Sequence, residues 1–367
     1  MTIKTPTYEP GQNINDIQKK YQIKKVIKLA SNENPSGPSK KALIAGEKVI
    51  QIINRYPDSK SKNLRKTINN YLSKSFINEN NIMIGNGSNE ILEFVARRYL
   101  NNTSEVLFCK HSFLVYKIIS KNAKAKIIES KPLMMPGKDY LSIDLDDMRS
   151  RITNKTRVIF IANPSNPTGT ALKVNKLTKF IDTVPKKIII VIDEAYYEYA
   201  VFRGLKSAIN LLKIYPNVII TRSFSKIHAL AGLRIGYGLA SNKIVNEFNI
   251  FRQPFNINYI AQEMAAVSLK DSAYVTKSLK DNDKGMKYLK LNFDKLCIPY
   301  LDSYANFLTI KTGSKTVEIY NKLLSQGIIL RPLINYGLSR YLRVTIGSET
   351  ENKYFIDKLT KILEFTE

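Results

Sequence analysis

The chain has 367 residues and a formal net charge of +26, with 57 lysine and arginine residues against 31 aspartate and glutamate residues. Its 44 % hydrophobic content excludes a disordered chain, and no apolar run reaches the roughly 20 residues that a membrane-spanning helix needs. Two cysteines and two histidines are too few for a disulfide framework or a zinc site, and the N-terminal residues do not resemble a signal peptide. We therefore expect a reduced, cytoplasmic protein that holds no metal and contacts no membrane.

The positive charge by itself would suit a protein that binds nucleic acid. It is spread along the whole chain, however, and forms no long block of consecutive basic residues. Lysine, asparagine and isoleucine are used heavily together, which favours a biased base composition of the gene as the cause. We expect no nucleic-acid partner, although the charge would attract small anions.

Short apolar runs alternate with amphipathic stretches through the first two thirds of the chain. The runs predict buried strands at residues 106–109, 127–128, 157–162, 188–193, 218–221 and 235–239. The amphipathic stretches predict helices at residues 90–100, 174–184 and 205–214. This alternation predicts an α/β fold around an open, mostly parallel sheet.

Beyond about residue 255 the pattern changes. Long helices are predicted at residues 259–269 and 274–296, followed by short strands at 307–311 and 342–346 and by a last helix with apolar residues at helical spacing. We predict three parts: an N-terminal arm that belongs partly to the smaller domain (1–49), a large domain (50–255) and a small C-terminal α/β domain (256–367).

Two candidate binding features lie near the first predicted strands. In Gly85-Asn-Gly-Ser-Asn-Glu90 the glycines permit close approach, Ser88 is a plausible N-cap, and the helix start that includes Asn89 attracts phosphate. The stretch is neither a Walker loop nor a dinucleotide fingerprint, and an ordinary helix cap is the alternative. Phe113 can stack on a planar ring or simply fill the core.

Two further stretches end predicted strands. The sequence NPSNPTG at residues 163–169 predicts a rigid turn that fixes the amide of Asn166 at the sheet edge. Asp193 ends an apolar strand, where a carboxylate can hold a protonated ring nitrogen, and Tyr196 can donate its hydroxyl to the same ligand. A capping role at a strand–helix junction suits Asp193 as well.

Lys226 follows the strand predicted at residues 218–221. A lysine that is partly desolvated and close to other cations can lose its proton near neutral pH and attack a carbonyl group. Ser223, Ser225 and Arg234 offer hydroxyl groups and a guanidinium fork, which are the groups that hold a phosphate. Taken alone, such a lysine is more often exposed in a polar loop.

Together and in this order, these stretches resemble the pyridoxal-phosphate-dependent aminotransferases of the aspartate aminotransferase fold, and most closely the histidinol-phosphate aminotransferases. The resemblance includes residues 8–11, 28–35, 55–58, 331–332 and 341–347 and extends over nearly the whole chain. It implies fold type I of these transferases, with a large domain built on a mostly parallel mixed sheet between helices and a smaller α/β domain.

The resemblance also implies roles for the matching residues. Lys226 would bind the aldehyde of pyridoxal 5'-phosphate and move the substrate proton, with Asp193 at the pyridine nitrogen. The other implied cofactor contacts are Phe113 on the ring face, Asn166 and Tyr196 at the ring hydroxyl, and Ser88, Asn89, Ser223, Ser225 and Arg234 at the phosphate. Tyr56 would reach the cofactor phosphate of a neighbouring subunit, which implies a homodimer with shared active sites. The implied substrate contacts are Tyr8, Asn32, Arg331 and Arg343, of which Arg343 would bind an acidic group.

The implied reaction transfers an amino group between histidinol phosphate and 2-oxoglutarate, giving imidazole-acetol phosphate and glutamate, in histidine biosynthesis. Two departures from the family pattern leave substrate preference open: Ser36 replaces a bulky residue, and residues 110–112 replace a more usual Pro-Thr before Phe113. The alternatives are an aromatic amino acid aminotransferase and a threonine-phosphate decarboxylase. A DNA-binding regulator is a further alternative, but no segment of about sixty residues is left over for its second domain.

Overall fold

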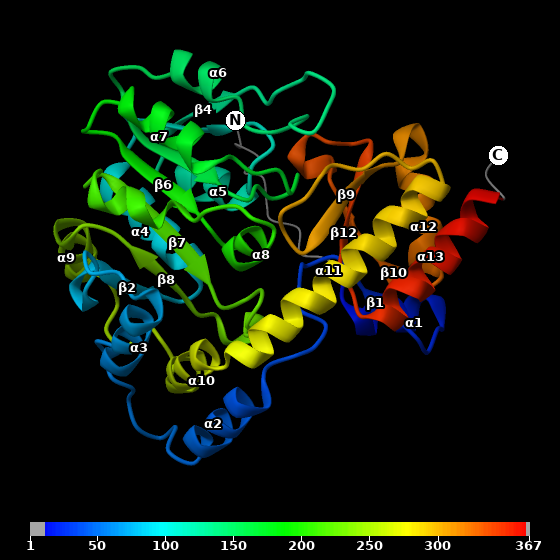
Figure 1. Cartoon of the computed structure of the whole chain (residues 1–367), viewed down its shortest axis with the longest axis horizontal. Coiled ribbons are helices and arrows are strands. Elements are labelled where there is room, and N and C mark those ends of the chain that lie inside the picture. The colour runs from blue at the N-terminus through cyan, green and yellow to red at the C-terminus, as the bar shows by residue number, and fades with distance from the viewer. Residues whose placement is uncertain (1–11, 365–367) are drawn as a thin grey trace.

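The computed structural model describes residues 12–364 and is built around a seven-stranded sheet (Figure 1). The strand order is β2-β8-β7-β6-β5-β3-β4. These strands are β2 (Ile82–Gly85), β3 (Glu105–Cys109), β4 (Lys126–Ser130), β5 (Thr156–Ala162), β6 (Ile189–Asp193), β7 (Val218–Ser223) and β8 (Gly236–Leu239). β8 runs antiparallel to β2 and β7, whereas the other pairs are parallel. The predicted mostly parallel mixed sheet is confirmed.

Helices cover both faces of this sheet. Alternate side chains of β5 point to opposite faces, so Ile159 and Ile161 belong to one core cluster and Val158 and Phe160 to another. The first cluster includes residues of α3 (Lys62–Leu72), α6 (Leu145–Ser150), α7 (Val174–Asp182) and α10 (Tyr259–Lys270). The second includes residues of α4 (Ser88–Tyr99), α5 (Leu114–Asn122) and α9 (Asn242–Phe251). Burial on both faces explains why these strands consist of nearly continuous apolar runs.

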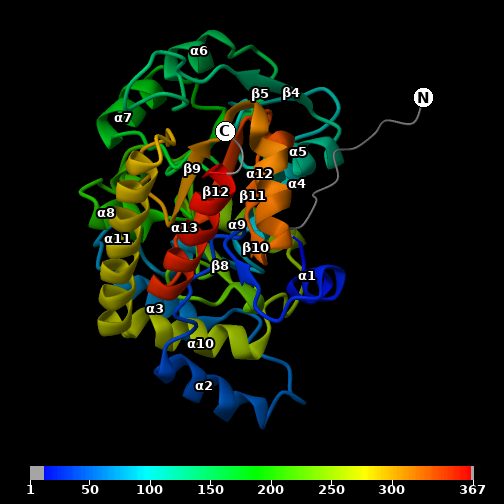
Figure 2. The same ribbon diagram turned by 90° about the vertical axis from the view of Figure 1, so that its right-hand side faces the viewer.

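A smaller three-stranded antiparallel sheet has the order β11-β12-β9, with β9 (Phe307–Lys311), β11 (Arg331–Pro332) and β12 (Tyr341–Thr345). It shares a third core cluster with α11 (Ser272–Lys295), α12 (Thr316–Ser325) and α13 (Glu349–Glu364). Figure 2 shows α13 between α11 and α12, in front of the strands. Long helices beyond residue 255, followed by short strands and a final helix, agree with the predicted order.

The N-terminal residues divide between the two parts. α1 (Ile14–Tyr21) contacts α12, and β1 (Ile27–Lys28) pairs with β10 (Ile328–Ile329). α2 (Lys40–Ile50) packs instead against α10, at the opposite end of the N-terminal segment (Figure 1). The exact domain boundaries at residues 49 and 255 stay predictions. None of the helices within residues 12–364 is both long and apolar enough to cross a membrane.

Two local predictions were wrong. Residues 205–214 form only a shorter 3-10 helix, Ala208–Lys213. The carboxylate of Glu194 accepts the N–H of Ala208 at 2.6 Å and so holds the start of this helix against the end of β6. Residues 127–128 lie in a half-buried strand rather than a buried one, because β4 is at the edge of the sheet.

Candidate active site

A cavity of about 210 Å³ lies at the edge of the large sheet where the parallel strands end. Ten of the predicted site residues line it: Ser88, Asn89, Phe113, Asn166, Asp193, Tyr196, Ser223, Ser225, Lys226 and Arg234. β3, β5, β6 and β7 are parallel, so their carboxyl ends meet at one edge and bring these distant segments together.

Lys226 reaches the cavity from the loop after β7. Its Nζ donates to the main-chain oxygen of Ser31 at 3.1 Å and forms no ion pair with a carboxylate in the described structure. Burial, helped by the guanidinium groups of Arg343 and Arg234 and opposed by Glu33, lowers the pKa of Lys226 to about 8. A substantial fraction of this amine is therefore unprotonated in mildly alkaline solution.

Asp193 is the last residue of β6 and is 6 % exposed. The register places it beside Ala162 of β5 and Thr221 of β7. Its Oδ1 accepts the Thr221 hydroxyl at 3.0 Å and its Oδ2 accepts the Tyr116 hydroxyl at 2.9 Å. Burial raises the pKa of Asp193, and these hydrogen bonds oppose that rise because they stabilise the carboxylate.

The start of α4 borders the cavity beside Arg234. Gly87, with φ of 75°, occupies the N-cap position and Ser88 is the first helical residue, so the predicted N-cap at Ser88 was wrong. Position 87 requires glycine, because φ is positive there and a Cβ would lie 2.6 Å from Nη2 of Arg234. A Cβ at Gly236 of β8 would lie 2.4 Å from the nitrogen of Ser88. The two glycines thus let the helix start, the arginine and β8 approach closely.

Hydroxyl groups complete this side of the cavity. Ser223 ends β7, and its Oγ accepts the N–H of Ser225 at 3.1 Å. Arg234 has a left-handed φ of 53° and donates from Nη1 to the main-chain oxygen of Ala231 at 2.9 Å. Two serines, a guanidinium group and the positive end of the α4 dipole together suit a phosphate group.

Tyr196 connects the cavity with the N-terminal segment. Its hydroxyl oxygen accepts from Nδ2 of Asn32 at 2.8 Å, and burial raises the pKa of Tyr196 to about 12. Asn32 has φ of 55°, and its N–H donates to Oγ1 of Thr345 in β12 at 2.9 Å. Asn32 therefore holds Tyr196 of the large sheet against the smaller sheet.

Arg343 of β12 lies next to the cavity, behind Asn166. Its Nη1 donates to Oδ1 of Asn166 at 2.6 Å and its Nη2 to the main-chain oxygen of Ala30 at 2.7 Å. Its buried Nε has no hydrogen-bond partner in the described structure. Arg331 of β11 is paired in register with Arg343 and is 7 % exposed, so two arginines are buried side by side.

Not every predicted site residue lines the cavity. Asn32, Arg331 and Arg343 are not among its lining residues, although Asn32 and Arg343 are hydrogen-bonded to Tyr196 and Asn166, which are. Tyr56 is 81 % exposed and stacks on Phe255, with ring centroids 4.7 Å apart, away from the cavity of its own chain. Tyr8 lies outside the described residues.

The sequence did not single out four residues at the site. Ser31 and Glu33 line the cavity from the segment after β1, and Thr221 and Tyr116 donate to Asp193. The sequence offered a signal for Thr221, because it is the polar residue at the end of the apolar run of β7. Tyr116 had the weakest signal, since an aromatic residue in an amphipathic helix normally indicates core.

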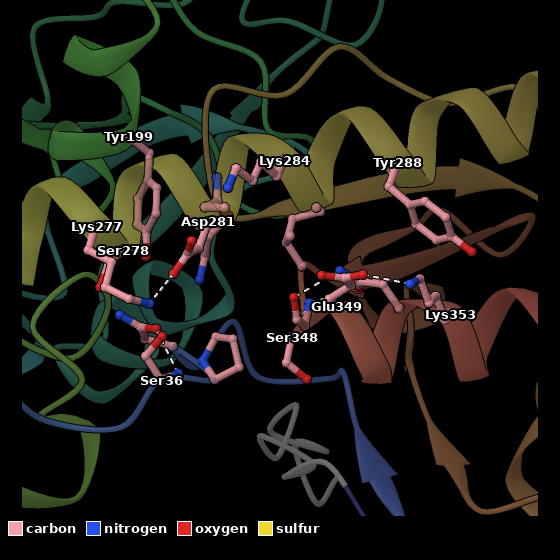
Figure 3. A pocket seen from close by; sticks show the side chains of 18 residues that line it. Ser36, Tyr199, Lys277, Ser278, Asp281, Lys284, Tyr288, Ser348, Glu349 and Lys353 are labelled. Carbon is pink, nitrogen blue, oxygen red and sulfur yellow. Dashed lines mark hydrogen bonds and ion pairs between the residues drawn. The ribbon is translucent and has the colours of Figure 1, made fainter.

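A second cavity of about 570 Å³ shares no lining residue with the first. It lies between α11, the start of α13 and the segment after β1. Figure 3 shows Lys277 and Asp281 on one wall and Glu349 and Lys353 on the other. Within residues 12–364, no group of three or more histidine, cysteine, aspartate or glutamate side chains is placed to hold a metal ion.

A lysine with a lowered pKa and a buried carboxylate, both facing one cavity at the edge of a parallel sheet, define an α/β enzyme for carbonyl or amine chemistry. The family model "Aminotransferase class I and II" matches residues 24–359. The chain therefore belongs to the class I and II aminotransferases.

Relatives within this family are similar over almost their whole length. Histidinol-phosphate aminotransferase 1 of Idiomarina loihiensis is 40 % identical over 97 % of this chain and 94 % of its own. The crystal structure of the histidinol-phosphate aminotransferase from Clostridium acetobutylicum is 28 % identical, with a TM-score of 0.84 over 93 % of this chain and all of that one. The Sinorhizobium meliloti enzyme, solved with pyridoxal-5'-phosphate, has the same fold, with a TM-score of 0.88 at 22 % identity over 100 % of this chain and 99 % of that one. The resemblance predicted from the sequence is confirmed.

Proposed function

We propose that this chain transfers an amino group between histidinol phosphate and 2-oxoglutarate, in histidine biosynthesis, with pyridoxal 5'-phosphate as its cofactor. The observation that carries the proposal is the placement of Lys226 and Asp193 in one small cavity. Their joint presence matters because the chemistry needs an amine to bind an aldehyde and a carboxylate to hold a ring nitrogen. The similarity to histidinol-phosphate aminotransferases over 97 % of the chain supports the choice of substrate.

The cavity residues fit this cofactor in charge and shape. The phosphate would be held by Ser88, Asn89, Ser223, Ser225 and Arg234, where Gly87 and Gly236 leave no room for a Cβ and so bring the helix start close. Asp193 would bind the pyridine nitrogen, while Asn166 and Tyr196 would bind the ring hydroxyl. Phe113 would lie against the ring face.

Lys226 provides the proton transfers. Bound pyridoxal phosphate supplies an electron-withdrawing ring that makes the Cα–H bond of the substrate acidic. Lys226 Nζ accepts the Cα proton, and its lowered pKa leaves the amine free to do so in mildly alkaline solution. Asp193 would stabilise positive charge at the ring nitrogen, because the hydrogen bonds from Tyr116 and Thr221 favour its ionised form.

The buried arginines provide one site for two kinds of acidic substrate. A guanidinium fork pairs equally well with a carboxylate and with a phosphate. Arg343 would bind the acidic group with its unpartnered Nε, and Arg331 lies beside it on β11. Asn32 and Tyr8 would complete the substrate contacts. The same arginines thereby serve glutamate in one half-reaction and histidinol phosphate in the other.

We propose further that two copies form a homodimer in the cytoplasm with shared active sites. Tyr56 is well placed to contact a second subunit, because it is exposed and does not line the cavity of its own chain. Several exposed apolar residues lie on the neighbouring segments: Ile44, Ile50, Ile52, Ile53 and Ile250. Exposed apolar surface of this kind is typical of a subunit contact.

A substrate panel tests the function directly. Purified protein loaded with pyridoxal 5'-phosphate is assayed with 2-oxoglutarate and, in turn, histidinol phosphate, phenylalanine and threonine phosphate. The highest kcat/KM is expected for histidinol phosphate, with glutamate as the product. A preference for phenylalanine, or release of carbon dioxide from threonine phosphate, would replace this proposal with one of the alternatives.

A further inference from the structure

Tyr116 lies directly behind the cavity but does not line it. It belongs to α5 and is fully buried. Its hydroxyl donates to Oδ2 of Asp193 at 2.9 Å. The hydroxyl therefore touches the carboxylate that would hold the pyridine nitrogen, while the tyrosine itself stays out of reach of cofactor and substrate.

The ring of Tyr116 is held from two sides. It stacks on Phe160 of β5, with centroids 4.7 Å apart and planes inclined by 6°. It meets Phe113 edge to face, with centroids 5.9 Å apart and planes at 88°. Phe113 precedes α5, so the first turn of this helix joins the two rings. One buried tyrosine thus contacts both the carboxylate and the aromatic residue assigned to the cofactor ring.

The contacts of Asp193 show what the hydroxyl does there. Thr221 donates to Oδ1 and Tyr116 donates to Oδ2, so each carboxylate oxygen has one side-chain donor. Two donors on different oxygens fix the plane of the carboxylate, and each oxygen keeps acceptor capacity for the cavity. The tyrosine also counteracts the effect of burial, which raises the pKa of Asp193, and so favours the ionised form.

We propose that Tyr116 is a positioning residue that sets the orientation of Asp193 and Phe113 toward the cofactor ring. The inference rests on the proposed function, because it concerns the same cavity. Tyr116 acts only through other side chains. The strength of cofactor binding therefore depends on a hydroxyl that never contacts the cofactor.

The test compares Tyr116→Phe with the unaltered protein. This substitution removes one oxygen and keeps the stacked ring. The dissociation constant of pyridoxal 5'-phosphate, followed by its visible absorbance, is expected to rise about tenfold, because a hydrogen bond to a charged group is lost. In the loaded enzyme kcat is expected to fall by about the same factor, with KM for the amino substrate unchanged. Tyr199→Phe is the matched control, since Tyr199 is as well buried but makes no contact with Asp193.

A second variant and a stability measurement distinguish a positioning role of Tyr116 from a merely structural one. Phe160→Leu removes the ring on which Tyr116 stacks and retains the hydroxyl, so it should weaken cofactor binding in the same direction but less. A lower melting temperature of Tyr116→Phe with an unchanged cofactor dissociation constant would show a merely structural role and overturn the proposal. Cofactor binding needs no substrate, so this readout remains valid if the substrate panel contradicts histidinol-phosphate transamination.

Discussion

Two of the cavities that the described residues form, the candidate active site and the cavity beside α11, differ in size and in how their charged side chains are paired. The larger, of about 570 Å³, is lined by exposed lysines that pair one helical turn away, Lys277 with Asp281 and Lys353 with Glu349, each at 2.6 Å. The smaller, of about 210 Å³, holds Lys226, whose Nζ donates to a main-chain oxygen and forms no ion pair with a carboxylate in the described structure. Exposed ion pairs between residues i and i+4 contribute little to the free energy of folding. The smaller cavity is therefore the proposed active site, because it combines a partly desolvated lysine with a buried carboxylate.

The largest difference between the two cavities is expected when one lysine is removed from each. Lys226→Ala should lower the turnover of amino substrate by at least about 1,000-fold, because both the nucleophile and the proton carrier are lost. Lys284→Ala in the larger cavity should leave turnover unchanged. Steady-state assays of the loaded proteins check both, and residual activity near the normal value in Lys226→Ala would end the assignment.

The next largest effect on kcat is expected when a carboxylate in each cavity is replaced by an amide. Asp193→Asn should reduce kcat by about 100-fold, because an amide cannot stabilise a protonated ring nitrogen as a carboxylate does. Asp281→Asn removes a carboxylate from the larger cavity and should have no effect on kcat. Equal kcat values for the two variants would contradict the role given to Asp193.

Substitution of the buried Arg343 should have a smaller effect, and this effect should be mainly on KM rather than on kcat. Arg343→Lys keeps the charge but loses the fork, so KM for the acidic amino donor should rise about 20-fold with a smaller change in kcat. Arg340→Lys, at an exposed position of the same segment, is the control. A fall in kcat alone would place Arg343 outside the substrate site.

The pH dependence of cofactor capture is the smallest expected effect. A pKa of about 8 leaves roughly one tenth of Lys226 unprotonated at pH 7 and roughly nine tenths at pH 9. The rate at which cofactor-free protein binds pyridoxal 5'-phosphate should therefore rise about ninefold over this range, as followed by stopped-flow absorbance. Protonation of Lys226 disfavours the folded state, so the free energy of unfolding should also increase as the pH rises from about 8 toward the pKa of an exposed lysine. A rate that falls with pH would mean that the protonated amine is the reactive form.

Prediction from the sequence succeeded for most strands of the large sheet, where an apolar residue indicates burial. The apolar runs predicted six of the seven strands of the large sheet, because burial on both faces requires continuous hydrophobicity, but the short strand β2 was not predicted. It failed where a long-range contact decided local structure. Glu194 holds the start of the 3-10 helix at Ala208 against the end of β6, and Arg234 lies so close to Gly87 that a side chain has no room there.

The amino-acid sequence alone determined the α/β class, six of the seven strands of the large sheet and the ten residues that meet in the smaller cavity, because strand ends in a parallel sheet converge at one edge. Only the tertiary structure decided which charges are desolvated and which side chains lie behind the cavity. The lowered pKa of Lys226, the orientation of Asp193 by Tyr116 and the outward position of Tyr56 depend on groups far away along the chain. Local patterning cannot encode such contacts, since desolvation and hydrogen-bond geometry are properties of the packed chain.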